Sequence, residues 1–134
     1  MKLSEHFTLS EMCVTTTGIP NKPTPAIERN LTQLCRNVLE PTRIMTNEPM
    51  IITSGYRCRA VNNKVGGASN SYHLKGLAAD IRVRNDAYAK KLLDIFALND
   101  HVDVALYEHS QTAKWIHVQT SDKPRHIINR DFKV

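Results

Sequence analysis

The sequence predicts an α+β fold in which helices pack on a small, mainly antiparallel sheet. Two segments carry apolar residues at three- and four-residue spacing, which is the pattern of amphipathic helices. Short apolar runs bounded by glycine or polar residues indicate strands, and a polar loop between the last two runs predicts a hairpin. At 134 residues the chain is long enough to bury one core, so we expect a single domain spanning residues 1–134.

The N-terminal segment predicts a short strand followed by one turn of helix. Residues 6–13 fit this pattern, with Ser10 as the N-cap, because a serine hydroxyl can accept a hydrogen bond from the first turn. Residues 14–24 are rich in threonine, glycine and proline, so they predict a loop.

The first long helix should begin at Pro25 with Thr24 as its N-cap, because proline is favoured at the first helical position. Pro41 should kink or interrupt this helix, since proline has no backbone N–H and its ring clashes with the preceding turn. We expect Ile44 and Met45 to continue the helix beyond that point. The stripe that faces the core consists of Ile27, Leu31, Leu34, Cys35, Val38 and Leu39.

The rest of the chain predicts four strands and two further helices. The strands are expected at 50–53, 77–83, 104–108 and 115–119. The helices are expected at 60–64 and 87–98. Because side chains alternate along a strand, Ala79 and Ile81 should face the core while Asp80 lies on the opposite face.

Charge and hydropathy narrow the classes of partner. The net charge of +5 and the pI near 9.3 suit an anionic partner such as nucleic acid or a bacterial cell wall. The basic residues are dispersed and no nucleic-acid motif accompanies them, so we expect no nucleic-acid partner. No apolar run approaches the ~20 residues of a membrane span, and the first residues lack the apolar core of a secretory signal. We expect a monomer that is cytoplasmic as synthesised.

Two imidazoles and one carboxylate form the most informative constellation in the chain. His73 and Asp80 stand seven residues apart, with Gly76 between them to allow a sharp turn, and His117 lies on a later apolar strand. A carboxylate in the middle of a strand is disfavoured unless a metal, a cation or several donors satisfy it. Three ligands with a fourth position left for water are the arrangement of a catalytic zinc. The pattern therefore favours a zinc site and hydrolytic chemistry.

Simpler readings exist for each of these residues taken alone. A single histidine in a strand is more often structural, because imidazole is moderately buried in most proteins. Asp80 could instead pair with Arg57 or Arg82. Taken jointly, the three residues favour the metal over these alternatives.

Four motifs stand in order along the chain: Ser54-Gly55-Tyr56-Arg57, residues 62–67, Ser71-x-His73-x-x-Gly76-x-Ala78-x-Asp80 and Trp115-x-His117. Together they resemble the zinc D-Ala-D-Ala carboxypeptidase family, in particular its short members from bacteria and phages. The resemblance covers nearly the whole chain and weakens after about Ser121. It implies the hedgehog/DD-peptidase fold and hydrolysis at D-amino acids in peptidoglycan stem peptides or cross-links.

The resemblance also implies roles for individual residues. His73, Asp80 and His117 would bind one Zn²⁺ ion. Arg57 would stabilise the charge that develops on the attacked carbonyl, although it could also be a structural partner of Asp80. Ser71 would contact the substrate.

The general base is the point at which this sequence departs from part of the family. Some relatives carry an acid three residues before the last zinc histidine, but this chain has Lys114 there. The nearest acid is Glu108, at the end of the preceding strand, where short members of the family also tend to carry a glutamate. A hairpin would bring Glu108 beside His117, although a one-residue slip in register would turn it away. We expect Glu108 to be the base, with His109 as the substitute.

Taken together, the sequence predicts a zinc-dependent carboxypeptidase or endopeptidase that acts on peptidoglycan peptides. Its size and the absence of a recognisable signal suit a phage or prophage lysis enzyme that degrades the cell wall once released. The alternative is a zinc-containing module of the same fold that binds a peptide or wall fragment without cutting it, because a fold does not dictate a function.

Overall fold

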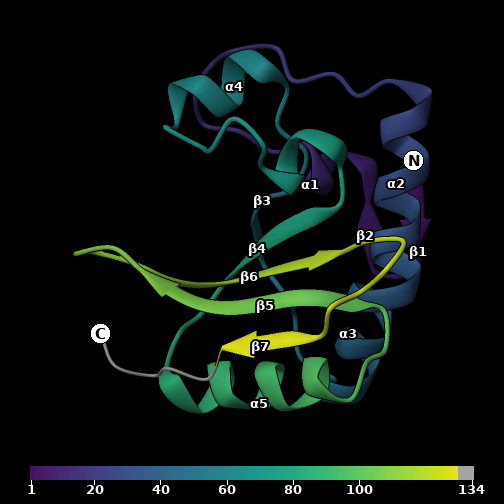
Figure 1. Ribbon diagram of the computed structural model, residues 1–134, viewed down its shortest axis with the longest axis vertical. Helices are drawn as coiled ribbons and strands as arrows, with labels where there is room; N and C mark the ends of the chain where they lie inside the picture. Colours follow the sequence, from purple (N-terminus) through teal and green to yellow (C-terminus); the bar gives the residue numbers. More distant parts are fainter. Residues whose placement is uncertain (130–134) are drawn as a thin grey trace.

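The computed structural model describes residues 1–129 and confirms the α+β class (Figure 1). Its main sheet has five strands in the order β3-β4-β6-β5-β7, and a separate two-stranded ribbon pairs β1 with β2. The strands are β1 (Lys2–Ser4), β2 (Phe7–Thr8), β3 (Ile52–Ser54), β4 (Ala78–Arg82), β5 (Val102–His109), β6 (Lys114–Thr120) and β7 (Ile127–Asn129). The α-helices are α1 (Leu9–Met12), α2 (Pro25–Leu34), α3 (Glu40–Thr46), α4 (Arg59–Lys64) and α5 (Asp86–Ala97).

The main sheet is antiparallel except at one edge, where β7 runs parallel to β5. The predicted hairpin is present as β5 and β6, with Leu106 directly opposite His117 and Glu108 directly opposite Trp115. On the other side of β6, Asp80 of β4 is the direct partner of His117. This register places Asp80, Glu108 and His117 on one face of the sheet.

The opposite face of the sheet is apolar and packs against the long helices. Ile81, Ile116 and Val118 are fully buried there, as the alternation predicted. Figure 1 shows α5 running alongside the strands and α2 standing at one end of the sheet. The helical residues in this shared core include Leu31, Leu34, Val38, Leu92, Leu93 and Phe96.

The first long helix begins at Pro25 with Thr24 as its N-cap, as predicted. A π-helical turn, Cys35–Leu39, separates α2 from α3, and in it the N–H of Glu40 donates to the carbonyl of Cys35. The wider turn falls next to Pro41, which lacks an N–H and would clash within a regular helix. The interruption at this proline is therefore a local change in winding, and the helix continues to Thr46.

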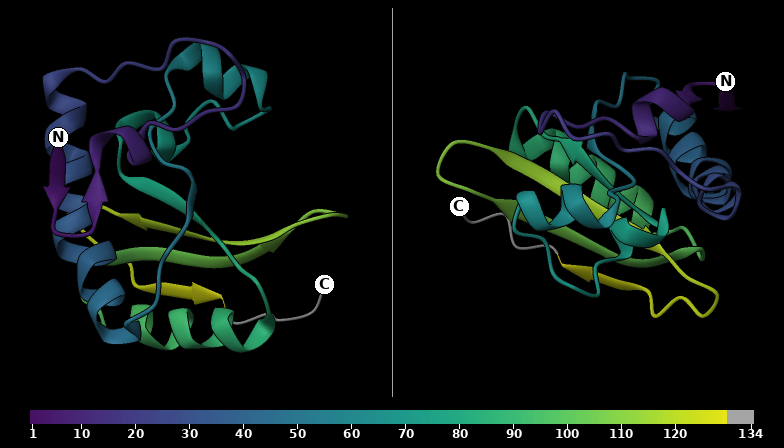
Figure 2. Two further views of the ribbon diagram at one scale, coloured as in Figure 1. Left: turned by 180° about the vertical axis from the view of Figure 1, so that it is seen from behind. Right: turned by 90° about the horizontal axis from the view of Figure 1, so that it is seen from above.

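Three local predictions were wrong or incomplete. The N-cap of α1 is Thr8 and not Ser10, because Thr8 and Glu11 form a reciprocal capping box. The strand expected at 50–53 is shifted to β3, and Ile51 is 50% exposed. β1 and β7 were not predicted. Figure 2 shows the β1–β2 ribbon lying against α2.

Membrane insertion through a helix has no support in the described part of the chain. Among residues 1–129, none of the helices has both the length and the apolar character needed to cross a bilayer.

Candidate metal centre

The three predicted ligand residues come together at one end of the sheet. His73 Nε2 and His117 Nδ1 each lie 3.2 Å from the same oxygen of Asp80, Oδ1. The three ligand atoms lie within 4.8 Å of one another. The side chains of His73, Asp80 and His117 are only 4%, 12% and 14% exposed. Two imidazole nitrogens and one carboxylate oxygen, held nearly dry and converging on one point, are a donor set that fits zinc.

His73 is held by a single turn of 3₁₀ helix, η2 (Tyr72–Lys75). Ser71 is the N-cap of this turn, and its hydroxyl accepts from the N–H of His73. Gly76 ends the turn with a φ of +71°, a conformation that glycine adopts without strain. The chain then enters β4, which carries Asp80.

The carbonyl of Gly55 selects the ring nitrogen of His73 that faces Asp80. His73 Nδ1 lies 2.7 Å from this carbonyl. A carbonyl can only accept, so Nδ1 must carry a proton, and Nε2 is the nitrogen that faces Asp80 and that a metal would use. Gly55 itself lies against α1, where the N–H of Tyr56 donates to the carbonyl of Met12.

Replacing Gly55 with alanine should destabilise the protein by about 1–3 kcal/mol, because the new methyl group overpacks a filled site. A Cβ at this position would lie 2.3 Å from the carbonyl oxygen of Met12, which is backbone and cannot swing away. Urea unfolding of both proteins measures the difference. An unchanged midpoint and slope would contradict this account of the contact.

The guanidinium of Arg57 links Asp80 of β4 to residues of β3 and α4. Its Nη2 lies 3.3 Å from Asp80 Oδ2, the carboxylate oxygen that the histidines do not share. Its Nε donates to Ser54 Oγ and its Nη1 to Asn62 Oδ1. The pairing with Asp80 that the sequence left open is therefore made by Arg57, and it coexists with the cluster of possible ligands. Sequence reasoning did not identify Ser54 and Asn62 as the acceptors that hold this guanidinium.

The electrostatics of the cluster keep Asp80 ionised. Burial opposes ionisation of Asp80, but hydrogen bonds with His117 and His73 outweigh it and hold the pKa of the carboxyl below its usual value. Burial also acts to lower the pKa of His117, while Asp80, Gln119 and the charge of Glu108 raise it above the ordinary value. A charged carboxylate between two imidazoles is the form that accepts a cation.

Glu108 lies on the same face of the sheet as His117, two residue pairs further along the β5–β6 ladder. Its Oε1 accepts a hydrogen bond of 3.0 Å from the indole Nε1 of Trp115. His109, the substitute base, is exposed at the end of β5. Lys114 faces away from His117 and pairs with Asp86 at the start of α5. Of these positions, Glu108 is the one that the register brings toward the cluster.

Comparison with known proteins agrees with this geometry. The sequence model of the family described as Peptidase M15 matches residues 5–119, which include the whole cluster. The chain belongs to the M15 peptidases. A search of curated proteins found no match to the chain. The resemblance that the motifs indicated is thus confirmed at the level of the family, and the fold is consistent with it.

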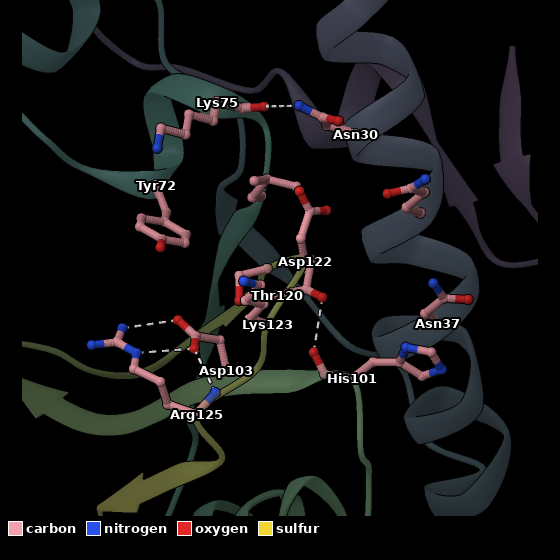
Figure 3. Close-up of a pocket in the computed structure, with 13 residues that line it drawn as sticks. Asn30, Asn37, Tyr72, Lys75, His101, Asp103, Thr120, Asp122, Lys123 and Arg125 are labelled. Carbon is pink, nitrogen blue, oxygen red and sulfur yellow. Dashed lines mark hydrogen bonds and ion pairs between the residues drawn. The ribbon is translucent and has the colours of Figure 1, made fainter.

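This M15 peptidase has a large polar cavity whose lining does not include the three cluster residues. The cavity measures about 860 Å³, and its walls include Asn30, Tyr72, Lys75, Asp103 and Arg125 (Figure 3). Tyr72 is the neighbour of His73 on η2, while Asp103 comes from β5. Asp103 connects the cavity to the cluster, because it accepts a hydrogen bond from Gln119, whose amide oxygen lies 2.7 Å from His117 Nε2.

Sequence reasoning missed Gln119, which contacts the M15 cluster directly. Its Oε1 lies 2.7 Å from His117 Nε2. The signal was present in the alternation of β6, since residues two apart on a strand share a face. Asp103 accepts a hydrogen bond from the amide of Gln119 and contacts neither of the two histidines.

Proposed function

We propose that the protein is a zinc metallopeptidase that hydrolyses peptide bonds at D-amino acids in peptidoglycan stem peptides or cross-links. The observation that carries this proposal is the convergence of His73 Nε2, Asp80 Oδ1 and His117 Nδ1 in a chain of the M15 family. Glu108, on the same face of the sheet, supplies the proton-transfer group that such a site needs. A phage or prophage lysis enzyme remains the biological setting that the sequence suggests.

His73, Asp80 and His117 would hold one Zn²⁺ ion and leave a position open, as catalytic zinc sites do. When bound, zinc lowers the pKa of a bound water toward ~7 and polarises a carbonyl oxygen. Asp80 supplies the one negative charge among the three ligands, while the carbonyl of Gly55 orients the imidazole of His73.

Glu108 would accept the proton of the attacking water and deliver it to the leaving amine. The indole N–H of Trp115 occupies Glu108 Oε1, so this carboxylate is held in place while its other oxygen can take the proton. The charge of Glu108 already acts on His117, which supports its nearness to the reacting centre.

Arg57 would stabilise the negative charge that develops on the attacked carbonyl oxygen. Its guanidinium has five N–H donors, three of which bind Ser54, Asn62 and Asp80. The other two make no hydrogen bond with the described residues 1–129, so they support a role toward substrate. Ser71 would contact substrate through its hydroxyl proton, since its oxygen already accepts from His73.

Arg57→Ala should lower kcat by about 10²–10³-fold, the usual effect of removing a donor to a developing oxyanion. Zinc content should stay at one equivalent, because all three ligands remain. Arg82→Ala is the matched control: Arg82 is an exposed arginine at the end of the same strand as Asp80, and its removal should leave kcat unchanged. Equal losses in both variants would contradict the specific role of Arg57.

The proposed function is tested by removing and restoring the metal. The purified protein is dialysed against a chelator, analysed for zinc, and assayed on peptidoglycan before and after one equivalent of Zn²⁺ is returned. We expect hydrolysis to disappear with the metal and to return with it. Hydrolysis that persists in zinc-free protein would overturn the assignment.

A further inference from the structure

A chain of hydrogen bonds runs from His117 away from the proposed metal position. His117 Nε2 lies 2.7 Å from Gln119 Oε1, and Gln119 Nε2 donates to Asp103 Oδ2 over 2.8 Å. Gln119 and Asp103 are 8% and 1% exposed. These hydrogen bonds therefore lie in the protein interior, where hydrogen bonds are strong and hard to replace with water.

Arg125 is the outermost residue of this series of hydrogen bonds. Its backbone N–H and Nε donate to Asp103 Oδ1 over 2.8 and 3.0 Å, and its Nη2 donates to Oδ2 over 2.9 Å (Figure 3). These hydrogen bonds hold the pKa of Asp103 well below its usual value despite burial. The Arg125 side chain is 57% exposed in the wall of the large cavity, so it can be replaced without opening the core.

The donors and acceptors in this series of hydrogen bonds, from Arg125 to His117, can be arranged in only one order. Arg125 only donates and the ionised Asp103 only accepts, so the Gln119 group that meets Asp103 must be the NH₂. The amide oxygen of Gln119 then faces His117, and His117 Nε2 must carry a proton. His117 Nδ1 is then the nitrogen that faces Asp80 Oδ1, and it is the one that would give its lone pair to a metal.

Asp80 favours the other tautomer of His117. Its Oδ1 lies 3.2 Å from His117 Nδ1, so in the metal-free protein it favours a proton on that nitrogen. A neutral imidazole with Nδ1–H cannot offer Nδ1 to a metal. The acceptor at Gln119 is the contact that opposes this tautomer.

We propose that Gln119 is a positioning residue that fixes the tautomer and ring orientation of His117, with Asp103 and Arg125 fixing the orientation of its amide. This inference rests on the proposed function, because it concerns His117 as a ligand. Contacts of this kind to ligand histidines are typically worth 10–100-fold in metal affinity.

Zinc affinity, measured by competition with a chromophoric chelator, provides the first test. Gln119→Met keeps the length of the side chain but removes its hydrogen bonds, and we expect zinc to bind about 10–100-fold more weakly. Thr120→Val is the matched control, since Thr120 is the next residue on β6 and its hydroxyl bonds to the carbonyl of His101, away from the cluster. We expect Thr120→Val to bind zinc like the wild type.

The tautomer of His117 provides a second test that needs no metal. Long-range nitrogen–proton NMR at alkaline pH, where imidazole is neutral, should report Nε2–H in the wild type and a shift toward Nδ1–H in Gln119→Met. Asp103→Asn frees the Gln119 amide to rotate. It should lower the zinc affinity and shift the His117 tautomer in the same directions as Gln119→Met, but by less. It replaces Gln119→Met as the test if that variant does not fold.

The results of these measurements distinguish a failure of the positioning role of Gln119 from a failure of the proposed function. Wild-type zinc affinity and wild-type tautomer in Gln119→Met and in Asp103→Asn would overturn the positioning role while leaving the metal site intact. A wild-type protein that binds no zinc would overturn the proposed function, and the tautomer measurement would still decide the role of Gln119.

Discussion

Glu108→Gln is expected to lower the turnover of peptidoglycan peptides by roughly 10²–10⁴-fold, the usual contribution of a general acid–base residue. Glutamine keeps the shape and can still accept the hydrogen bond from Trp115, but it cannot take up a proton. Bound zinc should stay at one equivalent, because Glu108 is not among the three ligands. Steady-state kinetics and metal analysis on the same preparation measure both quantities.

Two further variants make the result with Glu108 interpretable. Glu48→Gln changes a glutamate that pairs with Arg84 and Lys91 on the surface, and it should be as active as the wild type. His109→Gln tests the substitute base, and we expect little change because that side chain is exposed. A Glu108→Gln protein with full activity, together with an inactive His109→Gln protein, would reverse the assignment.

Asp80→Asn is expected to abolish both zinc binding and hydrolysis. The substitution removes the one negative charge among the ligands and leaves two neutral imidazoles beside the cation Arg57. We expect zinc affinity to fall by more than the 10–100-fold that contacts around a ligand are worth. Competition with a chelator measures the affinity, and circular dichroism checks that the fold persists.

Asp103→Asn is the comparison for this loss of charge, because Asp103 is also buried (1% exposed, against 8% for Asp80) but contacts Gln119 and not the ligands. It should weaken zinc binding far less than Asp80→Asn does. Equal losses in the two variants would mean that general destabilisation, and not ligand chemistry, accounts for the effect.

Alternation along strands allowed much of the site to be predicted from sequence. It places Asp80 and His117 on the face opposite the buried Ile81 and Ile116, and the register makes the two polar residues direct partners. The hairpin was also readable, but its register was not. Glu108 stands opposite Trp115 and not opposite His117, a detail that depends on turn geometry.

The parts that escaped prediction depend on contacts between residues far apart in the chain. Gly55 was quoted only as part of a motif, yet its carbonyl orients His73, eighteen residues later. Arg125 lies beyond the segment that resembles the family, and it reaches Asp103 only because the chain after β6 folds back toward β5. Local sequence patterns carry no information about such long-range pairings. The wrong N-cap at Ser10 is a different, local error, because Thr8 caps the helix through its reciprocal hydrogen bonds with Glu11.

Product analysis of purified muropeptides tests the central claim most directly. Protein loaded with one equivalent of zinc is incubated with stem peptides and cross-linked dimers, and mass spectrometry and amine labelling identify any new amino termini. The account predicts cleavage at a D-amino acid by the wild type and almost none by zinc-loaded Glu108→Gln, with the products distinguishing a carboxypeptidase from an endopeptidase. One bound zinc with no cleavage of any stem peptide would contradict it and favour a binding module.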